Sequence, residues 1–101
     1  MDYNNKMDKV AVFASTKFSK KLTMAFTLDE YDLGTLYTRN PLAIQYAEKK
    51  GIPVETSDGY KTLIDKARVA VFFWDGKSEN TKKAIDYCTR KESHTLCRVV
   101  Y

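Results

Sequence analysis

The chain has 101 residues, a net charge of +4, 44% hydrophobic residues and 30% charged residues. This length predicts a single domain with one core, and no stretch approaches the ~20 apolar residues of a membrane span. The lysines are scattered among acidic residues, which argues against a dedicated duplex-DNA binder. Residues 1–8 are polar and resemble neither a signal nor a transit peptide, so we expect a flexible lead-in to a cytoplasmic domain without a membrane partner.

The first apolar run, residues 9–14, predicts a strand. Residues 19–30 are ambiguous, because apolar residues alternate there as in a strand, whereas Ser19 could cap a helix. The helical alternative would place four apolar residues on one face: Phe18, Leu22, Ala25 and Phe26. Periodicity alone leaves both alternatives open.

The middle of the chain contains the clearest helix. Asn40 is a favourable cap, Pro41 suits the first helical position, and Gly51 ends the helix. Around it we expect two short strands, a turn and a two-turn helix: residues 33–37, 52–54, 57–59 and 60–67.

The longest wholly apolar run is residues 69–74, which predicts a strand covered on both faces, as in a parallel sheet. The turn Asp75–Ser78 follows, and Ser78 can cap a helix that runs to about residue 91. A last strand is expected over 95–101. Strands that alternate with helices predict an α/β fold, a single three-layer Rossmann-like domain with a mostly parallel five-stranded sheet.

The cysteines and the histidine do not form a metal-binding pattern. Cys88 falls on an expected helix and Cys97 on an expected strand, with neither CxxC nor zinc spacing, and His94 lies in a turn. We expect reduced thiols that pack in the interior, no metal and no cofactor.

Three segments resemble the SLOG superfamily, and within it the YspA-type branch: AEKKGIPV at 47–54, ARVAVFFWDGKS at 67–78, and Thr81. The resemblance implies a Rossmann-like fold, a helix over 19–30, and binding of nucleotides, nucleotide derivatives or single-stranded DNA. The chain departs from the pattern at two turns and at Asn80. It has Ala-Ser-Thr at 14–16 where the family commonly has Gly-Ser-Arg, and Thr-Arg-Asn-Pro at 38–41 where the family has a glycine-rich turn.

In a doubly wound sheet, the turns that follow the strands meet at the switch point and form a ligand site. We therefore expect a phosphate-binding site built from Ser15, Thr16, Lys17, Arg39, Asn40, Asp75, Gly76, Lys77, Ser78 and Thr81. Backbone N–H groups of Gly76, Lys77 and Ser78 would contact phosphate, and Lys77 and Arg39 would supply charge. Alternatively, Asp75 bonds its own turn and Ser78 only caps the helix.

The leading functional hypothesis is a small cytoplasmic sensor, sponge or modulator that binds a nucleotide or nucleotide derivative without catalysis. One alternative is an enzyme acting on nucleoside phosphates, similar to phosphoribohydrolases or deoxyribosyltransferases. The chain lacks the PGGxGTxxE motif of the former, and no catalytic glutamate of the latter can be placed. Another alternative is a module that binds single-stranded nucleic acid. A homo-oligomer and an origin in a phage or mobile element are further expectations.

Overall fold

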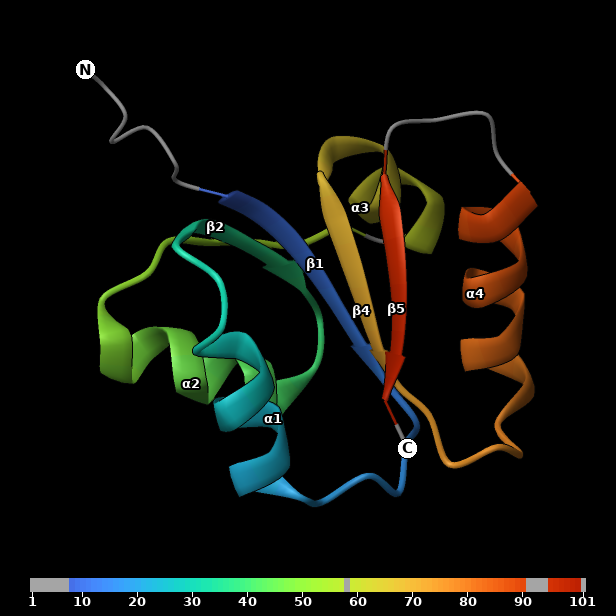
Figure 1. Cartoon of the computed structure of the whole chain (residues 1–101), viewed down its shortest axis with the longest axis horizontal. Helices are drawn as coiled ribbons and strands as arrows, with labels where there is room; N and C mark the ends of the chain where they lie inside the picture. Colours follow the sequence, from blue (N-terminus) through green and yellow to red (C-terminus); the bar gives the residue numbers. More distant parts are fainter. Residues whose placement is uncertain (1–7, 58, 91–94, 101) are drawn as a thin grey trace.

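The computed structural model describes residues 8–57, 59–90 and 95–100, which form five strands and four helices in alternation (Figure 1). In chain order these are β1 (Asp8–Ala14), α1 (Lys21–Leu28), β2 (Leu33–Thr38), α2 (Pro41–Lys50), β3 (Val54–Glu55), α3 (Tyr60–Lys66), β4 (Val69–Phe73), α4 (Glu79–Arg90) and β5 (Leu96–Val100). None of the helices within these residues is long and apolar enough to cross a membrane.

The five strands form one sheet in the order β3-β2-β1-β4-β5, and every neighbouring pair is parallel. This confirms the predicted α/β, Rossmann-like architecture. The two central strands, β1 and β4, pair in register from Val10 opposite Val69 to Ala14 opposite Phe73. All five residues of β4 are buried, as the run of apolar residues without alternation predicted.

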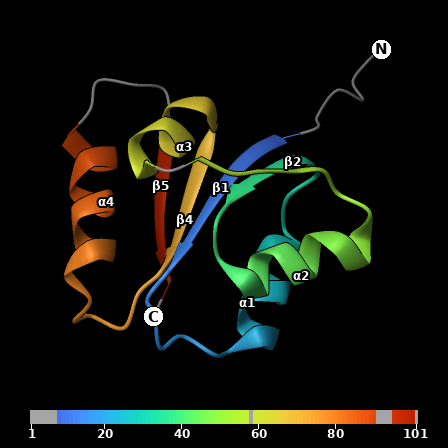
Figure 2. The same cartoon turned by 180° about the vertical axis from the view of Figure 1, so that it is seen from behind.

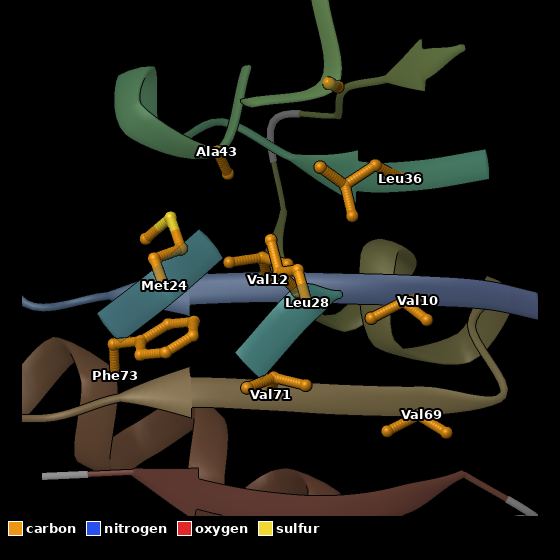
Figure 3. Packing of buried hydrophobic residues seen from close by; sticks show 10 residues of the cluster. Val10, Val12, Met24, Leu28, Leu36, Ala43, Val69, Val71 and Phe73 are labelled. Carbon is orange, nitrogen blue, oxygen red and sulfur yellow. The ribbon is translucent and has the colours of Figure 1, made fainter. Parts of the chain in front are cut away.

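Helices cover both faces of the sheet, α1 and α2 on one side and α3 and α4 on the other (Figures 1 and 2). Alternate residues of the central strands β1 and β4 therefore enter two separate cores. Figure 3 shows the first core, where Val71 and Phe73 of β4 lie close to Met24 and Leu28 of α1. The second core combines residues of β1, β4, α3 and α4: Ala11, Ala70, Phe72, Leu63, Ile64, Ala84 and Cys88.

The ambiguous residues 19–30 contain α1, so the helical alternative is correct and the strand alternative is wrong. The side of α1 that packs on the sheet is not the one that carries Leu22, Ala25 and Phe26. Met24, Thr27 and Leu28 are the buried residues of α1, whereas Leu22 and Phe26 are 70% and 67% exposed. Met24 and Leu28, four residues apart, fix the side of the helix that meets the sheet.

The ends of α2 follow the predicted chemistry. Asn40 Oδ1 accepts hydrogen bonds from the N–H groups of Leu42 at 2.9 Å and Ala43 at 3.2 Å, and Pro41 is the first helical residue. Gly51 ends the helix in the left-handed conformation, with φ 70°.

Several expected boundaries shift by one or two residues. Asp8 already belongs to β1, and β3 is Val54–Glu55 because residue 52 still donates its N–H to Ala47 O at the end of α2. Trp74 follows β4 instead of ending it. The expected lead-in at residues 1–7, Asp58, the last residue of the expected helix, the turn with His94 and Tyr101 lie outside the described residues.

Candidate functional site

The chain reverses its winding direction between β1 and β4. Their carboxyl ends lie side by side, and the chain then leaves toward α1 on one face and toward α4 on the other (Figure 1). Such a switch point is where open α/β sheets bind ligands. Ser15, which is buried, joins the two turns: its N–H donates to Phe73 O at 3.0 Å, and its Oγ accepts from the Asp75 N–H at 3.2 Å.

The turn that follows β4 is closed by its own aspartate. Asp75 Oδ1 accepts the N–H groups of Lys77 and Ser78, both at 2.8 Å, and Gly76 takes the positive φ of 82° that the turn needs. These two backbone hydrogen bonds are the main reason that the pKa of Asp75 lies below its usual value. The carboxylate thus holds two of the N–H groups that were expected to bind phosphate.

Ser78 caps α4, as predicted. Its Oγ accepts the Thr81 N–H at 3.4 Å and lies 3.3 Å from Thr81 Oγ1. Its carbonyl accepts the Lys82 N–H at 3.1 Å and the indole N–H of Trp74 at 3.0 Å. The start of α4 is therefore fixed to the turn by side-chain and backbone bonds at once.

The end of β2 is equally well fixed. The buried Thr38 donates its hydroxyl hydrogen to Val12 O at 2.7 Å, and its Oγ1 accepts the Asn40 N–H at 3.0 Å. Asn40 in turn caps α2. Arg39 lies between these two anchored residues, and its side chain is exposed. The backbone on both sides of Arg39 is thus held rigidly at the carboxyl edge of the sheet.

A cleft of about 620 Å³ opens at this edge between the end of β1 and the first turns of α3 and α4. Its polar lining consists of Thr16, Arg39, Asn40, Tyr60, Asn80 and Thr81. Apolar side chains of β1 and α3 complete it, among them Val12, Phe13 and Leu63. Phe13 itself stacks on Phe72, with ring centroids 5.1 Å apart, so this part of the wall is supported by the core.

The structure brings four of the ten predicted site residues together in the cleft: Thr16, Arg39, Asn40 and Thr81. Ser15 is buried and links the two turns, and Lys17 is exposed in the turn after β1. The remaining four, Asp75 to Ser78, form the turn that the Asp75 carboxylate closes, and none of them lines the cleft. Contact of that turn with a ligand stays a prediction.

Tyr60 and Asn80 line the cleft but were not among the predicted site residues. Both could have been found from topology. Tyr60 begins the helix that follows β3, and Asn80 lies in the first turn of the helix that follows β4. In a parallel sheet every such helix begins at the carboxyl edge, where the cleft lies.

The described lining of the cleft contains no aspartate, glutamate, histidine or cysteine. Across residues 8–57, 59–90 and 95–100, no group of three such side chains is placed to hold a metal ion. Cys88 and Cys97 are free thiols in the second core, away from this lining. Burial raises the pKa of the Cys88 thiol to about 12, so it stays protonated at neutral pH. The cleft therefore offers hydrogen bonds, an aromatic ring and one cation.

Comparisons of the chain with family models, with curated proteins and with solved structures each found no match. The α/β class with its parallel sheet therefore rests on the structure itself.

Proposed function

We propose that the protein binds a nucleotide or nucleotide derivative in the cleft at the carboxyl edge of the sheet, as a cytoplasmic sensor, sponge or modulator of the SLOG type. The observation that carries the proposal is the position of the cleft. It lies at the switch point of a doubly wound sheet, and its volume of about 620 Å³ suits a small organic ligand.

The lining suggests how such a ligand would be held. The Arg39 guanidinium would form a charge-assisted contact with a phosphate, which replaces the N–H groups of a glycine-rich turn. Thr16, Asn80 and Thr81 would bond hydroxyl and phosphate oxygens. The ring of Tyr60 would contact the base, since aromatic side chains stack on any nucleobase.

Binding without turnover is favoured because the described lining carries no carboxylate, imidazole or thiol. Hydrolysis at a nucleoside bond usually needs a carboxylate as acid, base or nucleophile. The enzymatic alternative makes a separate prediction: a nucleoside monophosphate incubated with the protein would release its free base. Sustained release that is lost in the Arg39→Ala variant would replace the binding proposal with the enzymatic one.

The test is a thermal-shift screen against mono-, di- and cyclic nucleotides, dinucleotide cofactors and ADP-ribose. A ligand at ~100 times its Kd adds about 2.7 kcal/mol of stability, which for a domain this small raises Tm by roughly 10 °C or more. Arg39→Ala should weaken binding roughly tenfold to a hundredfold, the worth of one charge-assisted hydrogen bond.

Arg68→Ala is the matched control, because Arg68 is an exposed arginine that directly precedes β4, at the opposite edge of the sheet. It should bind like the unmodified protein. No shift with any of these compounds, or equal losses in both arginine variants, would contradict the proposal. A shift with oligonucleotides alone that falls steeply with salt would point instead to single-stranded nucleic acid.

A further inference from the structure

Helix α3 begins without the kind of side-chain cap that holds the other two helices at the cleft. Asn40 caps α2 and Ser78 caps α4, whereas Gly59 precedes α3 and no side-chain hydrogen bond caps its start. Tyr60, the first residue of α3, nevertheless lines the cleft. Contacts from another element must therefore hold its ring in place.

Tyr87 of α4 makes such contacts. The rings of Tyr60 and Tyr87 meet edge to face, with centroids 6.0 Å apart and ring planes at 81°, a favoured geometry for an aromatic pair. The Tyr87 hydroxyl donates to Asp65 Oδ1 at 2.9 Å, and Lys61 Nζ lies 5.4 Å from the centre of the Tyr87 ring. Tyr60, Lys61 and Asp65 all belong to α3. Tyr87 thus contacts α3 at three residues and fixes Tyr60 relative to α4.

This arrangement supports the Tyr60 ring from outside the cleft, since Tyr87 is not part of the lining. An edge-to-face contact occupies at most one face of the Tyr60 ring, so the ring can still stack on a planar group in the cleft. A side chain that is already held in place loses less conformational freedom when a ligand binds. The tyrosine pair therefore provides a preorganised stacking surface at α3, separate from the Arg39 cation that follows β2.

The consequence concerns the class of ligand, and it rests on the proposed nucleotide site. We infer that the cleft selects ribose phosphates that carry a planar aromatic base over the same ribose phosphates without one, and that Tyr87 is the positioning residue that orients Tyr60 for stacking on that base. Arg39 contacts the phosphate and Tyr60 contacts the base. Loss of Tyr87 therefore weakens the contact with the base and leaves the contact with the phosphate intact.

Adenosine 5′-monophosphate and ribose 5-phosphate are the probes that test this inference, because they share the ribose and the phosphate and differ only in the base. NMR titration of the labelled protein measures the Kd of each. The unmodified protein should bind the nucleotide at least about tenfold more tightly, since base–aromatic stacking contributes roughly fivefold to a hundredfold in affinity. Tyr60→Leu should remove most of this preference.

Variants of Tyr87 test its positioning role. Tyr87→Leu should raise the Kd of adenosine 5′-monophosphate several-fold and leave that of ribose 5-phosphate unchanged. Tyr87→Phe keeps the ring and loses only the hydrogen bond to Asp65, so its effect should be smaller. Tyr46→Leu is the matched control. Tyr46 lies on α2 outside the cleft lining, its hydroxyl donates to Asp29, and Lys50 Nζ lies 5.7 Å from the centre of its ring.

A second readout needs no ligand. The ring-proton chemical shifts of Tyr60 should change in Tyr87→Leu and stay the same in Tyr46→Leu, and circular dichroism confirms that each variant is folded. Should Tyr87→Leu not fold, Tyr87→Phe carries the comparison.

Three results would overturn the inference and leave the nucleotide site standing. These are equal affinity of the unmodified protein for the two probes, an equal loss of both probes in Tyr87→Leu, and a loss of nucleotide affinity in Tyr46→Leu as large as in Tyr87→Leu. Binding of neither probe would also overturn the inference, and the thermal-shift screen then decides whether the proposed function falls with it.

Discussion

Thr38 shows how a single buried hydroxyl holds the site in place. It is fully buried, donates to Val12 O and accepts from the Asn40 N–H, so it connects β1, β2 and the start of α2. Thr38→Val keeps the shape but leaves a buried carbonyl and a part-buried N–H without their partner. We expect a loss of about 1–3 kcal/mol in the free energy of unfolding, measured by urea denaturation.

The matched control for this variant is Thr35→Val in the same strand, whose hydroxyl takes part in neither bond. It should change the free energy of unfolding by less than about 0.5 kcal/mol. Equal losses in the two variants would show that the hydrogen bonds of the Thr38 hydroxyl add nothing to the free energy of unfolding.

Asp75 makes stability depend on pH. Hydrogen bonds from the N–H groups of Lys77 and Ser78 lower its pKa below the usual 3.8, so its carboxylate favours the folded state above that pH. The contribution is lost as pH falls from the unfolded pKa through the lower folded one. Asp75→Ala should therefore lower Tm near neutral pH, and the difference from the unmodified protein should shrink as the pH falls below 3.8.

Thermal melts of both proteins between neutral pH and the acid range check this prediction. A Tm difference that is constant over the whole range would mean that the ionised carboxylate is not what stabilises the turn.

At the scale of elements, α2 ends in a left-handed backbone conformation that glycine adopts without strain and that other residues adopt at a cost. Gly51 has φ 70°, and a Cβ added there would meet no atom within 4 Å, so only backbone conformation opposes a side chain. Gly51→Ala should cost about 1–2 kcal/mol in the free energy of unfolding. Gly51→Asn should cost less, because asparagine adopts this conformation more readily. Chemical denaturation of both variants compares the two losses in free energy of unfolding. A larger loss for Gly51→Asn than for Gly51→Ala would contradict the prediction.

The elements differ in how far sequence alone could predict them. β4 was predictable because every residue is apolar, and α2 because Asn40, Pro41 and Gly51 are specific end signals. The packed side of α1 was not predictable, since apolar residues lie on more than one side of the helix and the polar Thr27 is itself among the buried residues. The sequence is compatible with Phe26 facing either the core or solvent, so only the packing of α1 against the sheet shows that it faces solvent.

At the scale of the whole molecule, stability should decline from the centre of the sheet to its edges. β1 and β4 each have a strand on both sides, whereas β3 has two residues and one neighbour. Hydrogen exchange followed by NMR should show the slowest exchange in the N–H groups of β1 and β4 and faster exchange in β3. Protection of β3 equal to that of β4 would contradict this order.

The topology of the fold also explains which part of the site could be predicted. Arg39, Asn40 and Thr81 follow strands at the carboxyl edge, so alternation of strands and helices was enough to bring them together. From the sequence, the hydrogen bonding of Asp75 within its own turn could be stated only as one of two possibilities. A carboxylate that closes a turn and a turn open to phosphate have the same residues, and their hydrogen bonds alone distinguish them.

The most direct test of the account is an NMR titration of the labelled protein with the nucleotide that gives the largest thermal shift. If the cleft binds the nucleotide, the largest changes in chemical shift should fall on backbone N–H groups around it, at Thr16, Arg39, Asn40, Tyr60 and Asn80. The N–H of Arg68, at the opposite edge of the sheet, should not move. Chemical-shift changes concentrated elsewhere would contradict the assignment of the cleft as the nucleotide site. So would a saturating ligand that leaves the chemical shifts of the cleft residues unchanged.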